Sequence, residues 1–299
     1  MKNSTTTESY TMMSGRLWAT AARSIGGGRW WLGAALLLIT AVVGGAEPHP
    51  LVTVEKGELP VILSAPHGGL RAIPGAMPRE GNGLERRPGG FVTGRDTATE
   101  ELATATARAI EKLLGKRPYL VAARSHRKYM DPNREAKEAY ESEPAKQVYD
   151  AYHGALSDAC QEVRKRFQRG LLLDLHGQSS SAETVFRGTK NGETVSLLRQ
   201  RFGEAAHTGD QSFFGRLRAL GFKVHPDPLD KREQSGFTGG YIVRHYGGDG
   251  GFGIDAIQLE FGKDYRTNAQ REKVATVLAQ AVESFATHYL DWKRPVSVP

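Results

Sequence analysis

The sequence contains a single cysteine, Cys160, among 299 residues. One cysteine cannot form an intramolecular disulfide, so the fold must be held together by its hydrophobic core. Cys160 lies in the charged helical pattern "SDACQEVRKRF", and no G-x-S-x-G elbow occurs. Both absences argue against a hydrolase that uses a cysteine or serine nucleophile.

The sequence also lacks the features of a nucleic-acid-binding protein. No lysine or arginine block alternates with aromatic residues, and no nucleic-acid motif occurs. The formal charge is +7, but the first 46 residues hold four basic residues and one acidic residue, which leaves +4 for the remainder. A charge this small gives little support to a polyanionic partner, so nucleic acid is not expected as a partner.

Long apolar runs are absent except near the N-terminus, where "WWLGAALLLITAVV" occupies residues 30–43. This run is shorter than the roughly 20 residues that span a bilayer. It follows a stretch with three arginines and precedes the small residues Gly44 and Ala46, a pattern typical of a signal peptide. We therefore predict that residues 1–46 are a cleaved signal and that the protein is exported to the periplasm or the extracellular space. An uncleaved membrane anchor is the alternative.

Residues 47–299 contain no internal repeat and are numerous enough for a single domain. Helical periodicity covers 103–114 and 274–285, and "TNAQ" predicts Thr267 as the N-cap of the second helix. Alternation of helices with strands predicts an α/β domain, a three-layer αβα fold with a mixed, mostly parallel sheet. The strand candidates are short apolar runs at 59–67, 118–124, 170–177 and 256–261.

Two long segments, 68–91 and 225–240, are irregular and rich in glycine, proline and charge. Long irregular loops in a compact domain are usually functional or disordered. Both segments follow a candidate strand, so they are expected to cover the carboxyl edge of the sheet, where open α/β sheets bind ligands.

Two histidines, His67 and His176, stand at the ends of candidate strands, and each precedes a glycine. Two imidazoles at one sheet edge favour a shared zinc ion, which commonly takes a carboxylate as its third ligand and one water. Asp96 in "GRDTATEEL" is the preferred carboxylate and Glu100 the alternative. A capping box of Thr97 with Glu100, and separate structural roles for the histidines, are the competing interpretations.

Glu260 lies inside the apolar run "AIQLEF". A buried glutamate is costly unless it pairs with a cation or takes part in chemistry. Beside a bound metal it would serve as a general base. A structural ion pair with Arg244 or Arg266 is the alternative.

The segment "YMDPNREA" places Asn133 and Arg134 just before a helical stretch. A guanidinium grips a carboxylate by two parallel hydrogen bonds, and an amide adds a neutral donor. Arg124 and Arg127 would contribute further positive charge. An exposed basic turn is the alternative for this segment.

The motifs "PHGG", "MDPNR", "DLHG", "GFTGGYIVRHYG" and "AIQLEF", in this order, resemble the N-formylglutamate amidohydrolase family. The likeness covers nearly all of residues 47–299, and "GFTGGYIVRHYG" is its most specific part. That family is similar in architecture to the zinc carboxypeptidases. The resemblance implies a three-layer α/β fold of phosphorylase/hydrolase type, a metal site that uses His67 and His176 with an acid between them, and Glu260 as the base.

In the carboxypeptidases a comparable Asn-Arg pair holds a substrate carboxylate, and an acid two residues earlier orients a metal-bound histidine. Asn133, Arg134 and Asp131 match those positions. The resemblance also implies that Tyr241, or Tyr246 in its place, lies with Arg244 in a loop that closes over the ligand.

One departure concerns the acidic ligand, because the carboxypeptidase pattern has a glutamate where this chain has Leu70. The carboxylate must therefore come from elsewhere, and Asp96 matches the amidohydrolase family best.

The sequence thus predicts an enzyme that binds one zinc ion through His67, Asp96 and His176 and hydrolyses the amide bond of N-formylglutamate or a related small N-acyl acidic amino acid. Glu260 would be the base, and Arg127 or Arg124 would stabilise the developing oxyanion. The alternatives are an exported metallopeptidase or amidase that acts on cell-wall or γ-glutamyl peptides, and a non-catalytic binder of the same fold.

Overall fold

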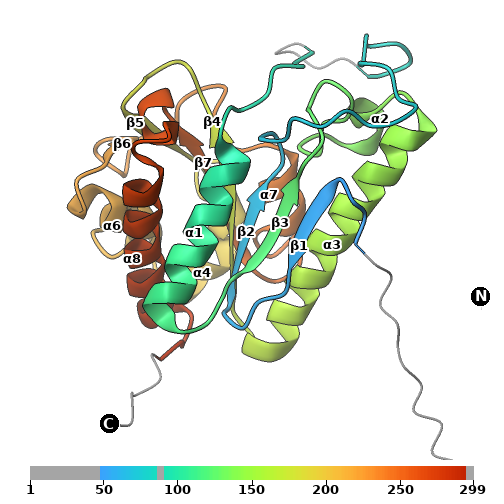
Figure 1. The fold of residues 1–299 in the computed structure, drawn as a ribbon. Coiled ribbons are helices and arrows are strands. Elements are labelled where there is room, and N and C mark those ends of the chain that lie inside the picture. The colour runs from blue at the N-terminus through green and yellow to red at the C-terminus, as the bar shows by residue number, and fades with distance from the viewer. Residues whose placement is uncertain (1–47, 86–90, 294–299) are drawn as a thin grey trace, which may run out of the picture. The chain divides into compact units, whose positions relative to one another are not determined.

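The computed structural model describes residues 48–85 and 91–293, so the predicted signal at 1–46 lies outside the described residues. Its centre is a seven-stranded sheet in the order β1-β3-β2-β4-β7-β5-β6 (Figure 1). The neighbouring strands β3, β2, β4 and β7 are parallel to one another, and β5 is parallel to β6. Strand β1 pairs antiparallel with β3, and β5 pairs antiparallel with β7. The strands are β1 Val52–Glu55, β2 Val61–Ala65, β3 Tyr119–Ala123, β4 Leu171–Gly177, β5 Thr184–Gly188, β6 Lys223–His225 and β7 Asp255–Phe261.

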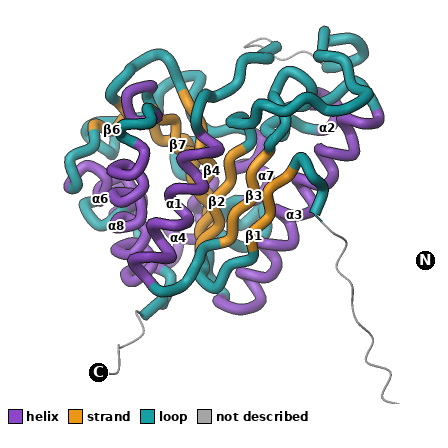
Figure 2. The backbone as a smooth tube through the Cα atoms, viewed as in Figure 1, coloured by secondary structure: helices purple, strands orange, loops and turns teal. Residues whose placement is uncertain are grey.

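Helices cover both faces of the sheet, which confirms the predicted three-layer α/β fold with a mixed sheet (Figures 1 and 2). Helices α1 and α8 pack against one another on one face, and α3 and α7 pack on the other. The helices are α1 Thr99–Leu114, α2 Ala136–Ala139, α3 Glu143–Phe167, α4 Ser196–Phe202, α5 Ala205–Thr208, α6 Phe213–Ala219, α7 Tyr241–Tyr246 and α8 Arg271–Tyr289, with 3-10 turns η1 Glu193–Val195 and η2 Lys263–Arg266.

In the central strands, successive side chains point to opposite faces of the sheet, and the polar side chains of the site lie on one of these two faces. In β4, Leu171, Leu173 and Leu175 enter the core beneath α1 and α8, while Leu172 enters the core on the α3 side. Because successive side chains in a strand point to opposite faces, His176 lies on the α3 and α7 face. The same face of β2, β4 and β7 carries a row of buried polar side chains toward the carboxyl edge: Ser64, Asp174, His176, Gln258 and Glu260.

The capping prediction for the last helix is wrong. Helix α8 begins at Arg271 with Gln270 as its N-cap, and Gln270 makes no side-chain cap. Thr267 instead closes the preceding 3-10 turn by donating its hydroxyl to the carbonyl of Asp264. The turn residues therefore delay the helix by one turn.

Within the described ranges, no helix is both long enough and apolar enough to cross a membrane.

Candidate metal centre

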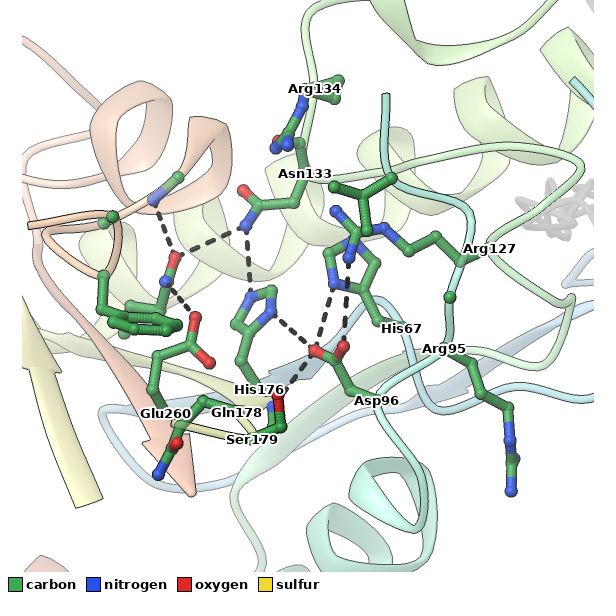
Figure 3. A pocket seen from close by; sticks show the side chains of 18 of the residues that line it. His67, Arg95, Asp96, Arg127, Asn133, Arg134, His176, Gln178, Ser179 and Glu260 are labelled. Atoms are coloured by element: carbon green, nitrogen blue, oxygen red, sulfur yellow. Dashed lines mark hydrogen bonds and ion pairs between the residues drawn. The ribbon is translucent and has the colours of Figure 1, made fainter. Parts of the chain in front are cut away.

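Three side chains from three separate segments meet at the carboxyl edge of the sheet. His67 follows β2, Asp96 precedes α1 and His176 belongs to β4. One Asp96 oxygen, Oδ2, lies 3.3 Å from His67 Nδ1 and 3.2 Å from His176 Nδ1. All three residues are buried, and one ligand atom from each lies within 4.8 Å of the others (Figure 3).

Parallel strand pairing and two glycines bring His67 to this position. Strands β2 and β4 are adjacent and parallel, so their carboxyl ends meet at one edge. A Cβ atom at Gly68 would lie 2.2 Å from the backbone nitrogen of Glu100, and one at Gly69 would lie 2.3 Å from the backbone carbon of Arg124. Only glycine therefore lets the chain after His67 pass between α1 and the end of β3.

Each histidine is oriented by a buried carboxylate on its other ring nitrogen. His67 Nε2 lies 2.7 Å from Asp131 Oδ1, and His176 Nε2 lies 2.8 Å from Asp174 Oδ2. Such a carboxylate fixes the ring orientation and raises the basicity of the nitrogen that faces a metal. The resemblance implied this orienting role for Asp131, whereas no role was predicted for Asp174.

Charge in the cluster is balanced across its buried members. Burial alone would raise the pKa of Asp96, but attraction to His67 and hydrogen bonds with both imidazoles hold that pKa well below its usual value. Asp131 behaves similarly, because Arg127 and His67 outweigh its burial and lower its pKa. Burial alone would lower the pKa of His176, yet Asp174 and Asp96 raise it well above the usual histidine value. The site thus strongly favours positive charge between its carboxylates.

The donor set fits a zinc ion. Two ligand atoms at tetrahedral positions around zinc are about 3.4 Å apart. The separations between Asp96 and the two histidines, 3.3 Å and 3.2 Å, match this value. Two imidazoles and one carboxylate also form the ligand set that leaves a fourth position open in catalytic zinc sites.

Glu260 lies beside this cluster, directly across the β4–β7 ladder from His176. Burial raises the pKa of Glu260 to about 7. Its Oε1 accepts a hydrogen bond of 2.8 Å from Gln258 Nε2, and it forms no ion pair with any described residue, including Arg244 and Arg266. Glu260 is thus a buried acid with a raised pKa in a cavity, and the structural ion pair considered as its alternative role does not form among the described residues.

A cavity of about 750 Å³ opens over the cluster. Among the predicted site residues, it is lined by His67, Asp96, Arg127, Asn133, Arg134, His176, Arg244 and Glu260. Residues 236–240 contribute to its wall, in agreement with the expectation for the loop 225–240, whereas the other wall segment, 92–97, follows the predicted loop 68–91 rather than belonging to it.

Two predicted substrate-binding residues do not line the cavity. Arg124 follows β3 and donates a hydrogen bond to the carbonyl of Pro50, beside the edge strand β1. Tyr241 begins α7 and stacks on His245 with ring centroids 5.0 Å apart. The structure therefore does not bring either side chain to the predicted site.

The alternative acid, Glu100, also lies elsewhere, in the first turn of α1 beside a shallow surface pocket. Leu70, which stands where the carboxypeptidase pattern has a glutamate, is exposed and does not line the cavity. Cys160 is buried in α3, and burial raises the pKa of its thiol. A cysteine in that setting is inert as a nucleophile.

Asn133 is engaged by the protein itself. Its Oδ1 accepts a 2.8 Å hydrogen bond from the backbone nitrogen of Ile242, and its Nδ2 faces Gln258 Oε1 at 3.4 Å. A Cβ atom at Gly240 would lie 2.2 Å from Asn133 Nδ2. Asn133 therefore anchors the start of α7 against the site.

Several residues that line or support the site were not predicted from the sequence. Polar residues that alternate with apolar ones inside otherwise apolar strands, Asp174 with His176 and Gln258 with Glu260, carried a usable signal. No comparable signal marked the loop residues Gln178, Lys190 and Phe237.

Fold and site together define an α/β protein with a candidate metal centre at the carboxyl edge of its sheet. A family model described as N-formylglutamate amidohydrolase matches residues 139–265, a segment that contains His176 and Glu260. The resemblance noted in the sequence is thereby confirmed, and the match supports a hydrolase that acts on amide bonds. No curated protein matches the chain.

Several solved structures are similar to this chain. An N-formylglutamate amidohydrolase from Ralstonia eutropha JMP134 has 19% sequence identity and a TM-score of 0.48, with 80% of this chain and 97% of that chain covered. The N-acetylmuramyl-L-alanine amidase Ami1 from Mycobacterium abscessus has 11% identity and a TM-score of 0.33, with 75% and 97% covered. Ami1 from Mycobacterium smegmatis has 11% identity and a TM-score of 0.34, with 76% and 97% covered.

Proposed function

We propose that this protein is a zinc-dependent amidohydrolase that cleaves the amide bond of N-formylglutamate or a related small N-acyl acidic amino acid, and that it acts after export. The observation that carries the proposal is the convergence of His67, Asp96 and His176 within 4.8 Å of one another, with Glu260 in the same cavity. The family match over residues 139–265 supports the reaction class.

The proposed ligands are His67 Nδ1, His176 Nδ1 and Asp96 Oδ2. Zinc bound there would supply a Lewis acid that polarises the amide carbonyl and acidifies water. Asp131 and Asp174 keep the two imidazoles aimed at the same point.

Glu260 takes the proton from the attacking water and returns it to the leaving nitrogen. A pKa of about 7 suits both halves of this transfer, because a general base works best when its pKa lies near the working pH. Arg127 lines the cavity, and although its Nε and Nη2 are held by Asp131, its Nη1 makes only a long 3.9 Å contact with Asp96 Oδ1; this nitrogen is the proposed donor to the oxygen that becomes negative during attack.

Arg134 is the proposed clamp for one substrate carboxylate. It lines the cavity, and one of its nitrogens, Nη1, is held by the carbonyl of Asn133 at 2.9 Å. This bond fixes the guanidinium while its remaining donors stay available for a bidentate contact.

The test is metal content measured together with hydrolysis of N-formylglutamate, before and after chelation and after zinc is restored. We expect about one zinc per chain, loss of turnover on chelation and recovery with zinc. Full turnover by metal-free protein would refute the zinc dependence.

A panel of muropeptides and γ-glutamyl peptides tests the substrate class separately. The signal-like N-terminal pattern favours cell-wall peptides as the second candidate substrate. Cleavage of those peptides without cleavage of acyl-glutamates would establish that alternative. Binding of acyl-glutamates without turnover, even after zinc is supplied, would indicate a non-catalytic binder.

A further inference from the structure

The cavity wall contains six basic side chains, and two of them are already committed to the protein. Arg266 donates to three backbone carbonyl groups. Arg127 donates from Nε to Asp131 at 2.9 Å. These two residues hold the wall together, so an anionic substrate must be recognised mainly by the others. The six are Arg95, Arg127, Arg134, Lys190, Arg244 and Arg266.

Lys190 differs from the other five because its ammonium has no hydrogen-bond or ion-pair partner within residues 48–85 and 91–293. Each of the five arginines makes at least one side-chain contact with the protein. Lys190 is half-buried and lines the cavity. A half-buried lysine without a protein partner in a cavity wall is a ready binding group for an anion.

The backbone at Lys190 is held in an unfavourable conformation. Lys190 has φ +52° and Asn191 has φ +55°, both in the left-handed region that side chains other than glycine seldom adopt. Such residues persist only where the surrounding structure enforces them, and they cluster at functional sites.

Glu233 enforces this conformation from the opposite loop. Its buried carboxylate accepts hydrogen bonds of 2.9 Å from the backbone nitrogens of both Thr189 and Asn191. Its own backbone nitrogen donates to Asn191 Oδ1 at 3.0 Å, and Arg187 Nε completes a buried ion pair at 3.1 Å. We call this group the Glu233 clasp; it fastens the strained turn to the loop that supplies residues 236–240 of the cavity wall.

We propose that Lys190, held in place by the Glu233 clasp, is the specificity-determining residue for the side-chain carboxylate of the substrate. An N-acyl acidic amino acid carries two carboxylates, and one guanidinium clamp at Arg134 accounts for only one of them. A second anionic group requires a second cation, and the partner-free ammonium of Lys190 supplies it. This inference rests on the proposed function and adds the residue that distinguishes an acidic side chain from its amide.

The experiment compares N-formylglutamate with N-formylglutamine in the zinc-loaded protein. For Lys190→Met we expect kcat/KM for N-formylglutamate to fall roughly 10–100-fold, chiefly through KM, with little change for N-formylglutamine. Lys190→Arg should retain most of the preference. Lys231→Met is the matched control, because Lys231 is exposed and lies outside the cavity lining.

Calorimetric binding of both compounds to the same variants gives a readout that needs no turnover. A wild-type protein that binds N-formylglutamate without hydrolysing it would refute the proposed function while still testing Lys190. Equal preference for the two compounds in the wild type, or an unchanged preference in Lys190→Met, would overturn the inference about Lys190.

Discussion

The position of Glu260 in the cavity is determined by the residues around it in strand β7. The residues that flank it in β7, Leu259 and Phe261, are buried in the opposite core, so alternation alone turns Glu260 toward the cavity. There it faces His176 across the ladder and accepts a hydrogen bond from Gln258. The main chain thus places this acid in the same cavity as the candidate metal ligands without making it one of the three grouped side chains.

The substitution Glu260→Gln distinguishes metal binding by this site from proton transfer. Glutamine keeps the acceptor that faces Gln258 but cannot take a proton, so we expect metal content to stay normal and kcat to fall by about 10²–10⁴-fold. His176→Ala is the comparison variant and should lose both metal and turnover. Near-normal hydrolysis by Glu260→Gln would remove this residue as the base.

At the scale of elements, the strained turn after β5 depends on the Glu233 clasp. Arg187 and Glu233 both have nearly inaccessible side chains, with 2% and 0% exposed. Loss of one partner from a buried ion pair leaves the other charge uncompensated. The clasp is therefore expected to control the stability of this region as well as the position of Lys190.

For Glu233→Gln we expect the free energy of unfolding to fall by about 3–5 kcal/mol, as measured by urea denaturation. The control is Asp150→Asn, which breaks an ion pair with Lys146 whose two side chains are 42% and 53% exposed. Because solvent screens this exposed pair, we expect a much smaller change for the control. Comparable losses of unfolding free energy in the two variants would contradict the stabilising role of the Glu233 clasp.

The elements that were predictable from the sequence are those whose signal is local. Strands β2, β3, β4 and β7 are buried on both faces, so they appear as apolar runs. The edge strand β6 was not predicted from the sequence. It has only three residues, "KVH", and its strand conformation depends on pairing with β5. The site divides in the same way: strand-end histidines are visible in the sequence, whereas Lys190 depends on contacts between two distant loops.

At the scale of the whole molecule, strand β7 carries a buried acid near each of its ends. Glu260 lies at the carboxyl end beside the site, and Asp255 begins β7 at the opposite end. Asp255 Oδ1 accepts a 3.1 Å hydrogen bond from the backbone nitrogen of Leu198 at the edge of α4. Burial raises the pKa of Asp255 from 3.8 to about 7. This acid therefore makes global stability dependent on pH.

The direction of the Asp255 pKa shift determines whether folding stability rises or falls with pH. A carboxyl group whose pKa is higher in the folded state contributes stability that is fully present below pH 3.8 and is lost as the pH rises to about 7. The full loss is on the order of 4 kcal/mol, of which about 2–3 kcal/mol falls between pH 5 and pH 8. Asp255→Asn keeps the acceptor for Leu198 but cannot ionise, so its stability relative to wild type should rise by that amount over this range. Urea denaturation at both pH values measures the difference, with the exposed Asp230→Asn as control. A difference between Asp255→Asn and wild type that stays constant from pH 5 to pH 8 would show that Asp255 is not the residue that couples folding to pH.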